Sequence, residues 1–364
     1  MGIDEIPLIG RRGNRGCQRS QCVVVVAMIA TTTLLGALAM PTQLRRTGDK
    51  GFAQMTFAHE SVRLTGRLWI DTDAACGHDA RTDPDDCLAI VLLARATGAR
   101  IAGISTVAGN APLEVVERTT RELAARLSAE LGRTLSVRTG NQGLAAALEE
   151  GSLTVVALGP LTNLAAVLDG RPELRANVTR IIAVMGRRPG HVFHPAEGAG
   201  GGMLFGHGPI FRDFNFEMDA TAATRTVALG VPLTLVPYDA ARRIEISAAD
   251  LDRLAAAGGA AAWVAERSRG WLAYWQRDIG RQGFSPFDLL AAAYVVEPQR
   301  FGCAEVQAWI GQDPTLFALF RRPNALLVRQ DTGSPEKPSA RGSARYCADV
   351  SNGIERWLVE RLAG

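Results

Sequence analysis

The stretches LWIDTD at positions 68–73 and DPDDCLAI at positions 83–90 decide the fold of this chain. The first ends an apolar strand in Asp71 and Asp73, which strand alternation sends to the same side. In the second, a proline suits the first position of a helix, so the two acids after it lie at a helix N-terminus. If the strand and the helix are neighbours, four acids meet at the carboxyl end of a strand, where open α/β sheets bind ligands.

These four acids support two interpretations. Unpaired carboxylates would repel and shift one another's ionisation, so the arrangement calls for a cation. Asp is also a common helix cap, and Thr82 with Asp85, or Asp83 with Asp86, has the spacing of a capping box. The segment taken alone leaves a metal site and a helix cap equally open.

Composition bounds the class of protein. The 364 residues with 47% apolar content are enough for a large core in one big domain or two small ones. The first 39 residues carry four arginines and two acids, so without them the net charge falls from +3 to +1. A basic excess typical of nucleic-acid binding does not remain, and we expect no nucleic-acid partner.

The N-terminus has the pattern of a targeting segment. Four arginines precede an uncharged stretch at 20–44, and ALA at 37–39 resembles a signal-peptidase site. The apolar run at 22–40 is also about long enough to span a bilayer as an uncleaved anchor. Residues 1–50 therefore predict an export signal or a membrane anchor plus linker, and a periplasmic, extracellular or membrane-anchored protein.

Six cysteines are scattered along the chain, and none forms a metal-type C-x-x-C pair. Outside the cytoplasm, Cys303 with Cys347, or Cys76 with Cys87, could be oxidised. The spacing of the cysteines does not decide the pairing.

From position 67 onward, strand and helix patterns alternate. Buried strands are predicted at 68–73, 101–107, 153–158, 180–186 and 231–236, and helices at 86–96, 112–131, 164–168 and 350–362. The repetition of strand, polar turn and helix indicates a single α/β domain over 51–364. We expect a mainly parallel open sheet, flanked by helices and Rossmann-like in type.

Two stretches break this alternation. Residues 187–212 include a glycine-rich segment that is too long for a plain connector. A mobile flap over a site and a surface insertion explain this segment equally well. Residues 330–345, where Gly, Ser, Pro and Lys cluster, are predicted to form an exposed loop before the closing helix.

Polar residues at several predicted strand ends could converge on one cleft. In chain order they belong to D-x-D with D-D, TVAGN ending at Asn110, GPLTN beginning at Gly159, DFN at 213–215, and Asp288 opening a late helix. In this order the motifs resemble those of the nucleoside hydrolases, the inosine-uridine-preferring N-ribohydrolase family, over roughly residues 66 to 362. Each motif is weak alone, whereas their joint order is specific.

The resemblance implies a role for each matching residue. Asp73 matches the acid that binds calcium and, as general base, takes the proton from the attacking water on the metal. The implied calcium ligands are Asp73, Asp86, the main-chain carbonyl of Leu158, and Asp288. The implied sugar-binding residues are Asp85, Asn110, Asp213 and Asn215, with His207 where the family has a sugar-binding Asn. Asp71 resembles an acid that orients the loop.

The implied chemistry suits these residue types. Calcium takes about six to eight oxygen ligands, and carboxylates, a carbonyl, waters and sugar diols all supply oxygen. A bound cation lowers the pKa of its water, and a neighbouring carboxylate can then act as base. Fixed anionic oxygens favour the oxocarbenium-like state through which N-glycosidic cleavage passes.

Three features depart from the family pattern. The turn between the acid pairs is longer, and we expect the extra residues 74–84 to bulge outward and leave the pairs in register. Phe287 stands where many members have a His that protonates the leaving base, and His207 replaces the Asn. The proton could come from His207 or His78 instead, or the base could stack on an aromatic ring.

Trp271 and Trp275 lie one helical turn apart shortly before Asp288, and together with Phe287 they could line a base pocket. Helical periodicity explains the tryptophan pair equally as an ordinary core stripe, and we favour that core interpretation.

We therefore expect calcium-dependent hydrolysis of the N-glycosidic bond of ribonucleosides to free base and ribose, by a homo-oligomer. The rival is a non-catalytic exported nucleoside- or sugar-binding protein that retains the metal site. A phosphatase interpretation of D-x-D fits less well, because Ala75 stands where that pattern requires Thr or Val.

Overall fold

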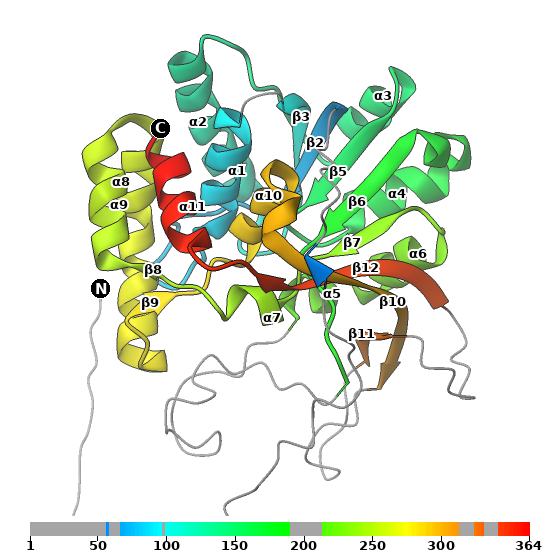
Figure 1. Ribbon diagram of the computed structural model, residues 1–364. Coiled ribbons are helices and arrows are strands. Elements are labelled where there is room, and N and C mark those ends of the chain that lie inside the picture. Colours follow the sequence, from blue (N-terminus) through cyan, green and yellow to red (C-terminus); the bar gives the residue numbers. More distant parts are fainter. Residues whose placement is uncertain (1–55, 58–65, 97–98, 190–212, 313–323, 331–340) are drawn as a thin grey trace, which may run out of the picture. The chain divides into compact units, whose positions relative to one another are not determined.

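The computed structural model describes residues 56–57, 66–96, 99–189, 213–312, 324–330 and 341–364. All of them belong to one compact unit, built on a ten-stranded sheet with helices on both faces (Figure 1). The α/β class and the mainly parallel sheet that the sequence predicts are confirmed.

The strands of the sheet lie in the order β1-β10-β12-β7-β6-β5-β2-β3-β4, with β11 paired to β10. Neighbours from β12 to β4 are parallel: β12 (Arg341–Val350), β7 (Leu233–Leu235), β6 (Val178–Ala183), β5 (Leu153–Ala157), β2 (Gly66–Thr72), β3 (Ala99–Thr106) and β4 (Val137–Thr139). The antiparallel edge consists of β10 (Phe301–Gln312), β1 (Thr56–Phe57) and β11 (Asn324–Arg329). A separate small sheet pairs β8 (Ile246–Ser247) with β9 (Gly283–Phe284).

The connectivity of the sheet singles out the end of β2. From β2 the chain continues to β3 and β4 on one side, whereas β5, β6 and β7 follow on the other side. The winding therefore reverses between β2 and β5. In open α/β sheets, ligands bind outside the carboxyl ends of the strands at such a switch point.

Helices cover the two faces of the sheet and enclose two hydrophobic clusters (Figure 1). The first cluster draws on α1 (Asp85–Arg95), α2 (Leu113–Leu131), α8 (Ala248–Ala257), α9 (Gly259–Tyr274), α10 (Phe287–Val296) and α11 (Ile354–Ala363). The second draws on α3 (Gln142–Glu149), α4 (Thr162–Gly170) and α6 (Ala220–Ala228). The shorter helices are η1 (Pro172–Asn177), α5 (Phe214–Met218), α7 (Tyr238–Ala241), the π-helical η2 (Trp275–Ile279) and η3 (Pro298–Arg300).

Strand β2 shows why an apolar run forms the centre of this sheet. Leu68 and Ile70 pack into the first cluster, and Trp69 packs into the second. A parallel strand with helices on both faces buries its side chains in both directions, so the middle of β2, residues 68–70, is apolar. At its carboxyl end the strand leads into the acid-rich turn.

The predicted exposed loop at 330–345 is wrong over its last residues. Residues 341–350 form β12, which is parallel to β7 and antiparallel to β10. The small residues suggested a loop, but Ala344, Tyr346 and Ala348 alternate inward and are buried. The closing helix consequently begins at Ile354, and not at position 350. Residues 331–340 lie outside the described part.

Both cysteine pairs that the sequence left open form disulfides, Cys76–Cys87 and Cys303–Cys347. Cys303 and Cys347 are directly opposed in the antiparallel pair β10 and β12. The second disulfide therefore links the antiparallel edge of the sheet to its last parallel strand.

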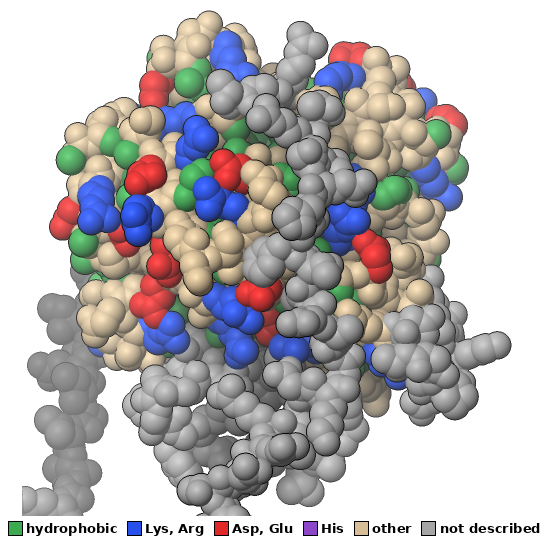
Figure 2. Space-filling view, viewed as in Figure 1, with side chains coloured by type: hydrophobic (Ala, Val, Ile, Leu, Met, Phe, Trp, Pro, Cys, Tyr) green, Lys and Arg blue, Asp and Glu red, His purple; other side chains and the backbone are tan. Residues whose placement is uncertain are grey.

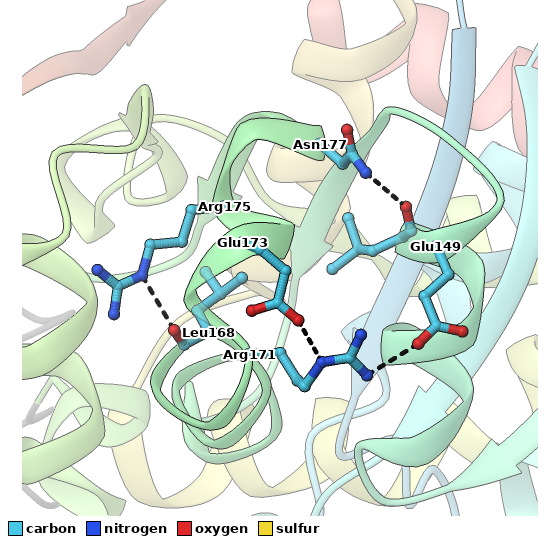
Figure 3. Close-up of polar contacts among 7 residues, drawn as sticks. Glu149, Leu168, Arg171, Glu173, Arg175 and Asn177 are labelled. Carbon is cyan, nitrogen blue, oxygen red and sulfur yellow. Dashed lines mark hydrogen bonds and ion pairs between the residues drawn. The ribbon is translucent and has the colours of Figure 1, made fainter.

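Charged and polar side chains tie η1 to the helices beside it (Figure 3). The Asn177 side chain donates a hydrogen bond to the Leu148 carbonyl at 2.9 Å. Arg171 pairs with Glu149 at 2.8 Å and also contacts Glu173. These side chains are exposed at the surface, and the arginine lies between the two carboxylates.

On the face shown in Figure 2, basic and acidic side chains of the described residues are interspersed. Within the same residues, none of the helices combines the length and the apolar character that crossing a membrane requires. The predicted anchor at 22–40 and most of the predicted flap, 190–212, lie outside the described part.

Candidate metal centre

The turn between β2 and α1 bulges outward, as its length predicts. Residues 77–81 are exposed, whereas the chain on either side of them is mostly buried. The Cys76–Cys87 disulfide joins the start of the turn to the first turn of α1. The bulge therefore leaves Asp85 and Asp86 beside the end of β2.

Asp73 lies against the ends of the two strands that flank β2. Its Oδ2 accepts a 2.8 Å hydrogen bond from the main-chain N–H of Asn110. A Cβ atom on Gly109 would lie 2.0 Å from Asp73 Oδ2, and one on Gly159 would lie 3.0 Å from Asp73 Oδ1. Glycine is required at these turns because the carboxylate occupies the space of a side chain.

Asn110 also links Asp73 to Asp86. Its side-chain amide donates to Asp86 Oδ2 at 3.1 Å, while its main chain holds Asp73. The hydroxyl of Thr72 donates to the other oxygen of Asp86. Residues after β2, after β3 and in the first turn of α1 thus meet at one corner.

Asp288 joins the same corner from α10. Its main-chain N–H donates to Asp85 Oδ2 at 2.7 Å, across 203 residues of sequence. Asp85, Asp86 and Asp288 each offer an oxygen within 4.8 Å of the others, a grouping that could hold a metal ion.

The capping-box interpretation of these acids is wrong, because the N-cap residues of α1 and α10 are Pro84 and Pro286, which have no side-chain cap hydrogen bond. The side chains of Asp83 and Asp85 do accept hydrogen bonds from the first two N–H groups of α1, at Asp85 and Asp86. The acids therefore contact both the start of the helix and one another. The sequence predicts Pro84 as the first residue of the helix, whereas the structure places it one position earlier, at the N-cap of α1.

Burial and mutual repulsion make these carboxyl groups hard to ionise. Burial, followed by the charge of Asp85, raises the pKa of Asp86 to about 7. Burial and neighbouring acids also raise the pKa values of Asp73 and Asp288 well above their ordinary range. Asp73 Oδ1 and Asp288 Oδ1 are buried without a hydrogen-bond partner in the described residues. Buried oxygens of this kind are suitable ligands for a hard cation, and a bound cation would offset the hydration that they lose on burial.

Asp71 is separate from this cluster, contrary to the expectation that four acids from the first two motifs meet. Its Oδ1 accepts hydrogen bonds from the Ser105 hydroxyl at 2.5 Å and from the Asn163 amide at 2.8 Å. Burial raises the pKa of Asp71 to about 6. Because β2 ends at Thr72, strict alternation stops there, and Asp73 follows Thr72 toward the cluster.

The Leu158 carbonyl, the predicted main-chain ligand, follows β5 beside Gly159. It accepts a 2.6 Å hydrogen bond from the side-chain amide of Asn215, which also donates to the Val184 carbonyl at 3.3 Å. Asn215 therefore reaches the strand ends at β5 and β6. A carbonyl oxygen has a second lone pair, so this contact leaves it able to ligate a metal.

Asp213 supports the neighbouring turn. Its side chain accepts from the Gly186 main-chain N–H at 2.7 Å and from the Phe216 N–H at 3.4 Å, which caps α5. Burial raises its pKa to about 6. His207, the remaining predicted sugar-binding residue, lies outside the described residues.

The aromatic predictions separate into two groups. Trp271 and Trp275 are 7% and 0% exposed and belong to the first hydrophobic cluster, as the core interpretation expects. Phe287, next to Asp288, stacks on Tyr238 with ring centroids 5.7 Å apart. His78 is the only histidine in the described part of the chain, and it is exposed on the outward bulge.

Two members of the site were not predicted. Thr72 holds Asp86, and partly buried Asp83 accepts a 3.2 Å hydrogen bond from the Asp85 N–H. Their positions between or beside the motif acids were the available signal, since a buried hydroxyl that stands directly between two carboxylates, as Thr72 does, needs a hydrogen-bond partner.

The sequence between β4 and β11 matches a known family. A sequence model described as "Inosine-uridine preferring nucleoside hydrolase" matches residues 136–319. The match contains Leu158, Asn215 and Asp288, whereas the acid turn and Asn110 precede it.

Curated relatives carry related names. The pyrimidine-specific ribonucleoside hydrolase RihA of Salmonella agona is 27% identical over 172 residues, 46% of this chain and 50% of that protein. RihA of Klebsiella pneumoniae is 29% identical over 162 residues, 44% of this chain and 47% of that protein. The chain thus spans about half the length of the curated relatives it matches.

Solved structures share the fold. A plant nucleoside hydrolase, the PpNRh1 enzyme, superposes with a TM-score of 0.65 at 16% identity, over 82% of this chain and 99% of that one. A purine-preferring ribonucleoside hydrolase from Gardnerella vaginalis gives a TM-score of 0.61 at 17% identity, over 82% and 98%. At these identities the likeness establishes the architecture.

Proposed function

The chain belongs to the inosine-uridine preferring nucleoside hydrolase family, and on this premise we propose that it hydrolyses the N-glycosidic bond of ribonucleosides to free base and ribose. The observation that carries the proposal is the grouping of Asp85, Asp86 and Asp288 at the switch point of the sheet, with Asp73 joined to Asp86 through Asn110. The relatives named above differ in base preference, so we propose ribonucleosides as the substrate class.

We propose calcium as the cofactor. Asp73, Asp86, Asp288 and the Leu158 carbonyl would hold it, because all four offer hard oxygen and two of the carboxylates have buried oxygens without a partner. When bound, the ion would supply positive charge that acidifies the attacking water and aligns the sugar hydroxyls. Sulfur and imidazole ligands, which softer metals favour, do not occur in this cluster of described residues.

Asp73 is the proposed general base. Its Oδ2 is fixed by the Asn110 main chain, so Oδ1 remains to accept a proton. The pKa of a useful base lies near the working pH, and burial raises that of Asp73 in this direction. The glycines at 109 and 159 leave free the space that this carboxylate occupies, since a Cβ at either position would lie within 3.0 Å of one of its oxygens.

Asp85, Asn110, Asp213 and Asn215 are the proposed sugar-binding residues, with His207. Asp85 and Asn110 already contact the acids of the cluster, and Asn215 contacts the Leu158 carbonyl. Sugar hydroxyls that bind here would lie beside the cation. Binding of the non-reacting hydroxyls can then promote orientation at C1′.

The leaving base has an aromatic neighbour in this proposal. Phe287 directly precedes Asp288 and stacks on Tyr238. A phenyl ring cannot donate a proton, so Phe287 contributes apolar contact and stacking to the base.

Ribose release tests the proposed reaction. Purified protein is incubated with inosine, uridine, cytidine, adenosine and guanosine, with calcium or with chelator, and free ribose is assayed. We expect release that disappears with chelator and with Asp73→Ala. Saturable nucleoside binding without ribose would instead establish the binding-protein rival, and phosphate release from a phosphomonoester would establish the phosphatase.

We also propose that the protein is exported through residues 1–50 and acts as a homo-oligomer. Two disulfides in the described residues support an oxidising compartment. Mass spectrometry of the mature N-terminus distinguishes cleavage near residue 39 from an intact anchor at 22–40.

A further inference from the structure

We propose that the Cys76–Cys87 disulfide positions the acid turn, so that divalent-cation affinity depends on the oxidation state of these two cysteines. The inference deepens the proposed function, because it rests on the cation assigned there. It assigns no chemistry of bond cleavage to either cysteine: both are positioning residues.

The disulfide links the two halves of the cluster. Cys76 follows Asp73 by three residues, and Cys87 follows Asp86 directly. Both cysteines are buried in the first hydrophobic cluster, at 2% and 0% exposure. A bond between them therefore fixes the separation of the acid after β2 from the acid in α1.

Besides the disulfide, hydrogen bonds hold the inner ends of the turn, from the Ala74 N–H to Thr72 and from the Asp85 N–H to Asp83, and its outer part packs on α9. Arg81 lies over the ring of Tyr274 with 5.4 Å to the centroid, and Gly77 and Ala80 approach α9 at Arg267 and Gly270. The exposed stretch 77–81 thus rests on α9, away from the acids.

Repulsion between the clustered carboxylates favours an open conformation of the turn. Asp85, Asp86 and Asp288 place carboxylate oxygens within 4.8 Å of one another, and like charges at this distance repel. Thr72 and Asn110 tie the strand ends to Asp86 by hydrogen bonds alone, so without the covalent link the strand end and the helix would separate more readily before a cation binds. The disulfide removes that freedom, so the ligands are preorganised.

Formation of the link is a two-electron oxidation. The thiolates of Cys76 and Cys87 form one S–S bond by exchange with a disulfide donor such as glutathione disulfide, which is reduced to two thiols and takes up the two protons. Secreted and periplasmic compartments favour this direction, and the cytoplasm opposes it. We therefore expect the protein to reach its full affinity for the cation only after export, when the disulfide has formed.

The chain contains a matched control. Cys303–Cys347 closes a separation of 44 residues, against 11 for Cys76–Cys87. In the chain-entropy account, a longer loop stabilises the folded state at least as much as a shorter one. The Cys303–Cys347 disulfide lies in β10 and β12, away from the acid turn in sequence.

The experiment titrates full-length protein with calcium chloride in a calorimeter. Three proteins are compared: the oxidised wild type, Cys76→Ala/Cys87→Ala, and Cys303→Ala/Cys347→Ala. We expect the first double variant to bind calcium about 10–100-fold more weakly, as for loss of groups that orient metal ligands. The Cys303→Ala/Cys347→Ala control should retain the wild-type Kd, and urea unfolding in chelator should show that it is no more stable than the Cys76→Ala/Cys87→Ala variant.

A second arm uses the Cys303→Ala/Cys347→Ala protein, in which Cys76–Cys87 is the disulfide that remains among the described residues. The protein is refolded in reduced or oxidised glutathione, the free thiols are counted by mass spectrometry, and the calcium titration is repeated. Weak binding in the reduced form supports the inference even if the Cys76→Ala/Cys87→Ala variant fails to fold.

The outcomes separate the two proposals. Equal Kd values for the wild type and the Cys76→Ala/Cys87→Ala variant overturn the disulfide inference and leave the calcium site standing. An equal loss of affinity in both double variants also overturns it, since the effect would then be one of general stability. Oxidised wild type that binds no calcium overturns both the cation and the inference.

Discussion

Two charged regions of this molecule follow opposite rules. At η1, Arg171 lies between Glu149 and Glu173, with all three side chains about half exposed or more (Figure 3). At the end of β2, Asp73, Asp86 and several other acids are buried together with no cation from the protein beside them in the described residues. The first group pairs opposite charges in water, and the second concentrates one sign of charge in the core.

The difference separates a structural role from a ligand-binding role. Exposed ion pairs contribute little to stability because water and salt screen them. Buried like charges oppose folding, and their presence indicates that another species neutralises them in the working protein. The contrast between the exposed charges and the buried acids predicts four results, of which the largest concerns the position of Asp73.

Gly109→Ala should break the acid cluster by sterics alone. The new Cβ would lie 2.0 Å from Asp73 Oδ2 and displace the proposed base. A displacement of about 1 Å at reacting groups costs about 100-fold in rate, so kcat should fall by that order. Ribose release under saturating nucleoside measures it.

Gly170→Ala is the control for this substitution, because a Cβ there meets nothing within 4 Å. It should leave kcat unchanged. A Gly109→Ala enzyme with full activity would show that the position of Asp73 is irrelevant to the reaction.

The pH dependence of the free energy of unfolding should also distinguish the acid cluster from the exposed charges at η1. In chelator, burial and Asp85 raise the pKa of Asp86 to about 7, so between about pH 4 and pH 7 the folded state keeps a proton that the unfolded state has released. The free energy of unfolding should therefore fall as pH rises, by up to about 1.4 kcal/mol per pH unit for this group.

Saturating calcium should weaken this pH dependence, because the ion favours the ionised carboxylates. Urea unfolding at several pH values, with chelator and with calcium, gives both curves. A stability in chelator that rises with pH over this window would refute the repulsion between the buried acids.

Asp288→Asn should stabilise the protein in chelator while abolishing its response to calcium. The substitution removes one of the repelling carboxylates, so the free energy of unfolding should rise by about 1–3 kcal/mol at neutral pH. Thermal unfolding with and without calcium measures both effects. The exposed Asp252→Asn serves for comparison and should change neither.

The smallest effect is expected at η1. Arg171→Ala removes the contacts to Glu149 and Glu173, yet these charges remain hydrated at the surface. Neither the unfolding midpoint nor the rate of ribose release should change measurably. A marked loss of activity would mean that this surface group is coupled to the site.

Much of the candidate site could be predicted from sequence because parallel strands end at a common edge. The apolar runs before Asp73, Asn110 and Leu158 place all three residues at carboxyl ends, and the structure brings those ends together at β2, β3 and β5. Asp288 was predictable only through the order of motifs, since its contact with Asp85 spans 203 residues.

Other features depended on tertiary contacts. Asp71 was expected in the cluster because alternation was extended past Thr72, where the strand ends. Strand β12 was missed because a segment rich in small residues becomes a strand only through its partners β7 and β10. The disulfide pairs could not be chosen from spacing, which says nothing of which cysteines become neighbours.

A crystal structure of the protein grown with calcium tests the central claim most directly. The account predicts one anomalous difference peak with oxygens of Asp73, Asp86, Asp288 and the Leu158 carbonyl at about 2.4 Å from it. A peak elsewhere, or a protein saturated with calcium in which the Asp73 and Asp288 carboxylates ligate nothing, would contradict it.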